Sequence, residues 1–156
     1  LIDEIRSKIP DIVIRTSFIV GFPGEGEDEF YELKDFLEQQ KFQWVGVFLY
    51  SREEGTYASN MKNQVSEEVK IQRKNSLMAL QKRITDSLNK KRVGKQEDVL
   101  IEREENGLLI GRTRKEAPEV DGKIYLYRGK REYIGKIKRV QIINSNFYDL
   151  KGIFIE

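Results

Sequence analysis

The sequence predicts an α/β unit with a parallel sheet, followed by a small all-β barrel of the OB-like kind. Between residues 11 and 51, two apolar segments flank one amphipathic helical segment, which is the pattern of a βαβ unit. From residue 95 onward, the apolar period changes to two and no helical segment follows. A long helical segment, residues 66–93, lies between the two parts and is expected to pack against the sheet.

The first part consists of strand, helix and strand. Residues 11–20 are β-branched and almost continuously apolar, so we expect a strand that is buried on both faces of a parallel sheet. In residues 25–40, apolar side chains share one face, and acidic side chains crowd the first turn, where the helix dipole favours anions. Residues 42–51 form the second apolar strand.

The long helix has predicted ends and one apolar stripe. Ser66 is the expected N-cap, the helix runs to about Val93, and Gly94 ends it. We therefore place the domain boundary near Gly94 or Lys95, giving domains 1–94 and 95–156. The stripe consists of Leu77, Leu80, Ile84 and Leu88.

The last part reads as five short strands. Asn106 and Gly107 lie between strand-like residues 97–103 and 108–113, and such a pair is the strongest short signal of a β-hairpin. Together with the three strands that follow, this number of short strands fits a small closed barrel. The further strands are expected at Gly122–Arg128, Tyr133–Ile143 and Tyr148–Ile155.

Composition excludes several kinds of chemistry. The 156 residues contain neither Cys nor His, which removes disulfides, thiolate and imidazole metal ligands and the commonest general base. The lack of Cys fits a reducing compartment, and we expect the cytoplasm. No segment reads as a membrane span or a targeting signal. Because the first residues look like the second half of an amphipathic helix, we expect further sequence upstream.

The net charge of +2 conceals a gradient along the chain. Residues 1–65 carry 7 basic and 12 acidic groups, and residues 66–94 carry 8 and 3. Residues 95–156 carry 13 and 11, which is nearly balanced. The basic middle segment is either a solvated helix face or a surface for an anionic partner such as RNA.

A turn of glycine and proline follows the first strand. It lacks the P-loop and dinucleotide-binding motifs, but it lies at the carboxyl end of a parallel strand, where α/β folds bind ligands. Gly21 and Gly24 allow close approach of a flat ligand, and Phe22 and Pro23 offer an apolar wall. The alternative is a tight connection whose glycines supply only positive φ angles.

Two segments together carry a resemblance to a known family. "TSFIVGFPGEGEDEF" and "VGVFLYSREEGTYA" resemble the fifth and sixth strands of the barrel in radical S-adenosylmethionine methylthiotransferases. The last part resembles the TRAM domain of that family. The resemblance implies the last units of a TIM-like (β/α) radical S-adenosylmethionine barrel, closed by the long helix and followed by an OB-like TRAM barrel.

Other segments are similar to one branch of this family. "GRTRKEAPEVDGKIYLY", "NFYDLKG" and the position of Arg15 resemble the branch that adds a methylthio group to the β-carbon of an aspartate in a small-subunit ribosomal protein. Two alternatives stay open: a methylthiotransferase acting on a tRNA adenosine, and a non-catalytic ribosome- or RNA-binding module.

The resemblance implies cofactors and cofactor-binding residues. The family uses S-adenosylmethionine and two 4Fe-4S clusters bound through Cys, so the cluster ligands would lie outside this Cys-free chain, and the chain alone would be inactive. Arg15 would pair with the substrate or the methionine carboxylate, although a structural ion pair is the alternative. The implied cofactor-binding residues are Arg15, Ile19, Gly21, Phe22, Pro23, Phe48, Tyr50 and Ser51.

The TRAM-like barrel would recognise the macromolecular partner. Its balanced charge favours a ribosomal protein as partner, while basic side chains gathered on one face would allow RNA. We expect no membrane partner, and the sequence leaves the oligomeric state open. The expected partner-binding residues are Arg112, Arg114, Glu119, Asp121, Tyr148 and Asp149.

Overall fold

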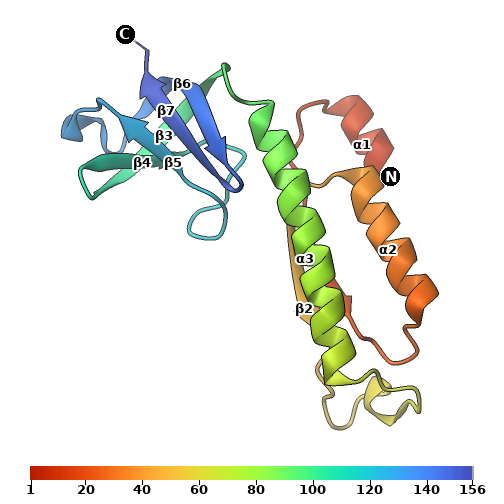
Figure 1. Cartoon of the computed structure of the whole chain (residues 1–156). Coiled ribbons are helices and arrows are strands. Elements are labelled where there is room, and N and C mark those ends of the chain that lie inside the picture. The colour runs from red at the N-terminus through yellow and green to blue at the C-terminus, as the bar shows by residue number, and fades with distance from the viewer. Residues whose placement is uncertain (156) are drawn as a thin grey trace. The chain divides into compact units, whose positions relative to one another are not determined.

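The computed structural model describes residues 1–155, which form two compact units (Figure 1). The first unit is Leu1–Ile84, and the second begins at Thr85. This division falls within a helix and upstream of the boundary predicted near Gly94, which stays a prediction. No helix of the described chain has the length and apolar character that crossing a bilayer requires.

The first unit contains a parallel pair of strands, two α-helices, a 3₁₀ turn and the first part of helix α3 (Glu67–Lys90). Strands β1 and β2 pair in parallel from Arg15 opposite Trp44 to Val20 opposite Leu49, which confirms the predicted parallel pairing. Helix α2 lies between them in the sequence, as a parallel connection requires. The elements are α1 (Ile2–Lys8), β1 (Arg15–Val20), α2 (Glu27–Gln40), β2 (Trp44–Leu49) and a 3₁₀ turn (Ala58–Asn60).

The core of the first unit lies on one side of this strand pair. The Phe18 ring contacts the Phe36 ring of α2 at 6.4 Å between ring centroids, and Val20 and Val47 are buried. The opposite side is exposed at alternate positions of β1. The prediction that residues 11–20 form a strand buried on both faces is therefore wrong for this chain, because its helices cover one face of the strand pair.

Helix α3 (Glu67–Lys90) begins as predicted. The Ser66 hydroxyl accepts a hydrogen bond from the Val69 amide at 3.4 Å, so it caps the helix. Leu77, Leu80 and Ile84 of the predicted stripe are buried. The helix ends at Lys90, and a turn that includes Gly94 in a left-handed conformation leads to the barrel.

The second unit is a closed five-stranded barrel, in agreement with the predicted OB-like barrel. The strand order is β3-β4-β5-β7-β6; β5 and β7 are parallel, and the other pairs are antiparallel. The hairpin at Asn106 and Gly107 is confirmed, and both residues have positive φ. The strands are β3 (Gln96–Glu105), β4 (Leu108–Arg112), β5 (Ile124–Tyr127), β6 (Ile137–Asn146) and β7 (Asp149–Phe154).

Some strands begin later than the apolar pattern predicts. The amide of Ile12 bonds to the Ile9 carbonyl oxygen in a turn, so β1 starts at Arg15 instead of residue 11. A 3₁₀ turn over Arg131–Tyr133 and the left-handed Gly135 delay β6 to Ile137. In both places local turns replace the start of an apolar run.

Candidate functional site

The turn after β1 is held by a buried ion pair. Gly21 has a φ of +76°, and its amide donates to both carboxylate oxygens of Glu25 at 3.0 Å. The same carboxylate binds the Arg73 guanidinium of α3 at 2.6 Å, and these two side chains are only 12% and 9% exposed. Arg73 also donates to the carbonyl oxygens of Glu25 and Gly26, both at 2.9 Å. Arg73 of α3 thus holds the second half of the turn, residues 25 and 26.

Lys70 of α3 holds the end of β2 in a similar way. Its Nζ donates to the Tyr50 carbonyl oxygen at 3.0 Å and to Glu67 at 2.9 Å. Its aliphatic stem fills the space beside Gly21, where a Cβ would overlap the Cγ of Lys70. The close approach that requires glycine at position 21 is therefore an approach of α3.

The amides of the turn are bonded within the chain. The Gly24 amide donates to the Asn63 carbonyl oxygen at 2.8 Å, and the Gly26 amide donates to Glu29 at 2.9 Å. The Glu25 amide donates to the Phe22 carbonyl oxygen at 2.9 Å. With these donors and that of Gly21 engaged, the turn is not a phosphate-binding nest. It offers apolar surface instead.

Phe22 and Tyr50 come together at the two strand ends. Their ring centroids lie 5.3 Å apart in an edge-on arrangement, and Phe22 is 46% exposed. The Tyr50 hydroxyl is buried and has no hydrogen-bond partner among the described residues. A buried hydroxyl without a partner lowers the stability of the folded chain.

Two large apolar side chains extend this surface along the strand pair. Ile19 of β1 and Phe48 of β2 are cross-strand partners, and they are 59% and 58% exposed. Side chains of this size are rarely exposed side by side without a function. The structure thus brings together four of the predicted residues: Ile19, Phe22, Phe48 and Tyr50.

The other predicted cofactor residues have different surroundings. Arg15 is the first residue of β1 and Gly21 follows its last residue, so the two lie at opposite ends of the strand, about 20 Å apart at the rise of an extended chain. Ser51 donates to Glu53 at 2.8 Å. Pro23 is a buried residue of the turn itself, and Gly21 contacts Lys70.

Sequence reasoning missed Lys70 and Arg73, which fix both strand ends. A signal was available in "SEEVKIQRK", because cations in the first two turns of a helix oppose the helix dipole. Basic residues at the start of a helix therefore suggest that their side chains bind oxygen atoms elsewhere in the fold, as Lys70 and Arg73 do here.

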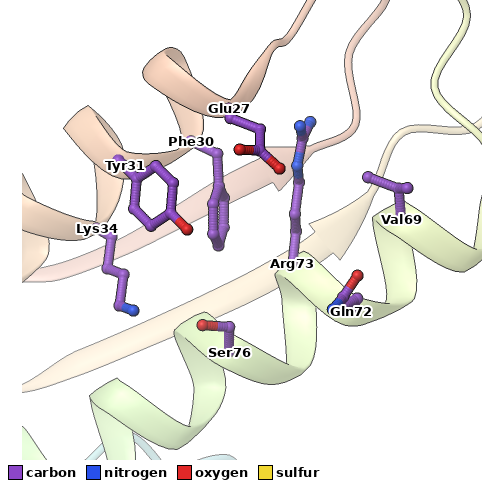
Figure 2. A pocket seen from close by; sticks show the side chains of 8 residues that line it. All are labelled: Glu27, Phe30, Tyr31, Lys34, Val69, Gln72, Arg73 and Ser76. Atoms are coloured by element: carbon purple, nitrogen blue, oxygen red, sulfur yellow. The ribbon is translucent and has the colours of Figure 1, made fainter.

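A cavity of about 220 Å³ lies between α2 and α3 (Figure 2). Side chains from both helices line it, and the Arg73 guanidinium lies over the Phe30 ring at 5.4 Å. None of the predicted site residues lines this cavity. Its lining consists of Glu27, Phe30, Tyr31, Lys34, Val69, Gln72, Arg73 and Ser76.

The barrel unit contains a buried charge network around Arg92. This guanidinium binds Glu97 at 2.7 Å and Glu116 at 2.6 Å, and Glu116 also accepts hydrogen bonds from the amide and hydroxyl of Thr113. Burial by itself would lower the pKa of Arg92, but the hydrogen bonds and charges of both carboxylates raise it. Burial would raise the pKa of Glu97, but Arg92 and then Lys115 lower it.

Three of the predicted partner-binding residues line one small hollow of about 20 Å³ on the barrel: Arg112, Glu119 and Asp121. Arg112 binds Glu102 at 2.7 Å, and Asp121 accepts the Ala117 amide at 2.7 Å. These pairs fix the rim of the hollow.

The other three predicted partner residues are placed differently. Asp149 accepts the amide of Lys123, a lining residue of the hollow, at 2.9 Å. Burial raises the pKa of the neighbouring Tyr148. Arg114 is exposed and does not line the hollow. Across residues 1–155, no group of three or more His, Cys, Asp or Glu side chains is placed to hold a metal ion.

Comparison with known proteins gives matches along nearly the whole chain. Residues 93–155 match a family model described as TRAM domain. The chain is 51% identical over 152 residues to the ribosomal protein uS12 methylthiotransferase RimO of Clostridium kluyveri, and 47% identical over 152 residues to that of Clostridioides difficile. These alignments cover 97% of this chain and 34% of each relative. The chain therefore spans about a third of the length of the curated relatives it matches.

Proposed function

Along 97% of its length this chain is homologous to the ribosomal protein uS12 methylthiotransferases, and we propose that it is the C-terminal part of such an enzyme. The whole protein would add a methylthio group to the β-carbon of an aspartate in ribosomal protein uS12. The observation that carries this proposal is the shared sequence, which includes both the strand ends and the barrel. We further propose that the protein works in the cytoplasm.

The first unit would supply the last strands of a (β/α) radical S-adenosylmethionine barrel. Ile19 and Phe48 support this assignment, because both are apolar and exposed on the face that α2 and α3 leave uncovered. In a complete barrel that face would be the interior. Helix α3 would then close the barrel and hold the two strand ends through Lys70 and Arg73.

The residues at the strand ends fit S-adenosylmethionine better than they fit a phosphate-rich ligand. Ile19, Phe22 and Phe48 would pack against the flat adenine, and the Tyr50 hydroxyl would bond to a polar atom of the ligand. When bound, the cofactor supplies the radical and methyl chemistry of the family. The chain's own residues orient it and exclude water.

This chain does not fit a 4Fe-4S cluster, because it has no Cys and no His. We propose that both clusters are bound by other parts of the whole protein and that this chain alone has no activity. The barrel would recognise the ribosomal protein through the hollow lined by Arg112, Glu119 and Asp121.

Replacing Tyr50 with Phe tests the cofactor assignment. In the full-length protein, Tyr50→Phe is expected to weaken S-adenosylmethionine binding about three- to tenfold, the range of one hydrogen bond. The same change is expected to preserve or raise thermal stability without ligand, because it removes a buried hydroxyl that has no partner. Calorimetric titration and thermal unfolding measure the two effects. The control is Tyr57→Phe, since Tyr57 is 86% exposed; unchanged affinity in Tyr50→Phe would contradict the assignment.

The substrate is tested with the reconstituted full-length protein. Purified uS12 and unmodified tRNA are each incubated with it, S-adenosylmethionine and a reductant, and both are analysed by mass spectrometry. A methylthio group on one aspartate of uS12 is the expected product. Modification of an adenosine in tRNA would instead identify the tRNA enzyme, and product on neither would favour a binding module.

A further inference from the structure

One face of helix α2 forms a hollow that the proposed cofactor site does not use. The hollow measures about 510 Å³, and within the described chain all of its lining residues belong to α2. They recur at intervals of three to four residues, which is the spacing of one helix face. The lining residues are Asp28, Tyr31, Glu32, Asp35, Phe36 and Gln39, and we call this surface the α2 hollow.

Two aromatic rings of the α2 hollow are exposed. Tyr31 is 53% exposed, and Phe36, whose ring also contacts buried Phe42 at 5.8 Å between ring centroids, is 37% exposed. The Tyr31 ring already accepts a cation, since the Lys34 ammonium lies 5.9 Å from its centroid (Figure 2). Exposed rings of this kind bind apolar groups and further cations.

The carboxylates of the α2 hollow are exposed and unpaired. Helix α2 carries six acidic side chains but only one basic side chain, that of Lys34. Asp28, Glu32 and Asp35 line the hollow, and none of them makes an ion pair with another residue in the range 1–155. Their negative charges are therefore available to a cationic ligand that lies against the two rings.

This placement of charge weakens the helix that carries it. Asp28 and Glu32 are four residues apart, and Glu32 and Asp35 are three apart, so like charges are neighbours on the helix surface and repel each other. The helix dipole favours the acidic residues of the first turn, including Asp28, but it does not favour Glu32 or Asp35 farther along. A cationic ligand in the α2 hollow would remove this repulsion.

We propose that the α2 hollow is a docking site for an arginine-rich segment of a protein partner. Guanidinium groups of that segment pair with the carboxylates of Asp28, Glu32 and Asp35. They also stack on the rings of Tyr31 and Phe36. Charge complementarity identifies the occupant, because the same carboxylates repel nucleic acids and anionic membranes. Arginine fits better than lysine, since its planar group both binds carboxylates through two hydrogen bonds and stacks on aromatic rings.

This docking site is separate from the sites of the proposed function. It includes none of the residues at the two strand ends and none of the barrel, and it does not depend on the methylthiotransferase reaction. The inference therefore also holds if the whole protein proves to be a binding module.

The test uses the full-length protein and fluorescence anisotropy with labelled oligoarginine and oligolysine of equal length. Oligoarginine is expected to bind more tightly. The double variant Glu32→Gln/Asp35→Asn is expected to weaken its binding about three- to tenfold, the range of two exposed ion pairs. The same variant is expected to preserve or raise thermal stability without peptide, because it removes neighbouring like charges. The loss of affinity is thereby separated from unfolding.

The Tyr31 ring is tested by its effect on the preference for arginine. Tyr31→Leu is expected to weaken oligoarginine binding about two- to fivefold, the range of an exposed cation–π contact, and to affect oligolysine less. Tyr31→Phe keeps the ring and is expected to keep the affinity. An unchanged preference for oligoarginine in Tyr31→Leu would contradict stacking in the α2 hollow.

The matched control is the double variant Glu54→Gln/Glu68→Gln. Both residues are exposed, belong to the first unit and lie outside the α2 hollow, so the control removes the same charge elsewhere and is expected to leave affinity unchanged. An equal loss in this control, no loss in Glu32→Gln/Asp35→Asn, or no peptide binding at all would overturn the proposal. A dimer that Glu32→Gln/Asp35→Asn dissociates would overturn it in favour of a second copy of the chain. None of these outcomes changes the expected binding of S-adenosylmethionine or modification of uS12, so the two proposals fail independently.

Discussion

Replacing Arg92 with Met is expected to destabilise the barrel unit by about 3–5 kcal/mol, the usual cost of removing one partner from a buried ion pair. Arg92 binds two carboxylates, those of Glu97 and Glu116. Glu116 is only 2% exposed, so water cannot take the place of the Arg92 guanidinium beside its carboxylate. Met keeps the aliphatic stem, and the expected loss is therefore that of the charge and its hydrogen bonds.

A separate probe in each unit shows which unit the Arg92→Met substitution destabilises. Trp44 is the single Trp of the chain and lies in the first unit, so its fluorescence follows the unfolding of that unit. Amide hydrogen exchange in β3 and β6 follows the barrel. Arg139→Met is the control, because Arg139 is 52% exposed and its pair with Asp98 is worth little. Exchange in the barrel that is equally fast in both variants would contradict the role of the network.

Acid is expected to weaken the same network in the unmodified protein. Glu97 has a pKa below its ordinary value of 4.5 because of Arg92 and Lys115. A depressed carboxylate pKa contributes stability that is complete above 4.5 and disappears as the pH falls through the lower value of the folded state. The free energy of unfolding of the barrel, measured from pH 7 to pH 3, should therefore fall below about pH 4.5. The fall should be smaller in Glu97→Gln, which has no carboxylate to protonate at this position.

Much of the fold follows from local patterns. The Asn-Gly pair at 106–107 sets its hairpin, because it accepts positive φ at both positions. Ser66 predicts the start of α3, and the switch to a period of two predicts the barrel. The ends of strands were predicted less well, because turns such as that over Arg131–Tyr133 interrupt an apolar run without a strong sequence signal.

The candidate site could be predicted only in part. The motif places Phe22 and Tyr50 at strand ends, and the parallel register brings their rings together. The side chains that hold them, Lys70 and Arg73, come from a helix distant in the sequence, and no local pattern says which oxygens they bind. The one-sided burial of β1 and β2 also depends on which elements cover the sheet, which the apolar content of a strand does not specify.

Gly21→Ala is expected to lower the free energy of unfolding of the first unit by roughly 2–4 kcal/mol. Gly24→Ala is expected to lower it less. Both glycines have positive φ, +76° and +90°, so Ala pays a similar backbone cost of roughly 1 kcal/mol at each. A Cβ at Gly24 meets no atom within 4 Å, whereas a Cβ at Gly21 overlaps the stem of Lys70. The difference between Gly21→Ala and Gly24→Ala, followed by Trp44 fluorescence in urea, therefore measures the contact with α3.

A double variant separates this contact from a direct role of Gly21 in ligand binding. Lys70→Ala removes the Cγ that a Cβ at position 21 would meet, so Gly21→Ala should cost less stability in that background than in the unmodified chain. If the two costs are additive, the glycine is required for its backbone angle alone. If they are not, Gly21 is the point where α3 sets the position of the turn, and the substitution would affect a cofactor only by moving Phe22 relative to Tyr50.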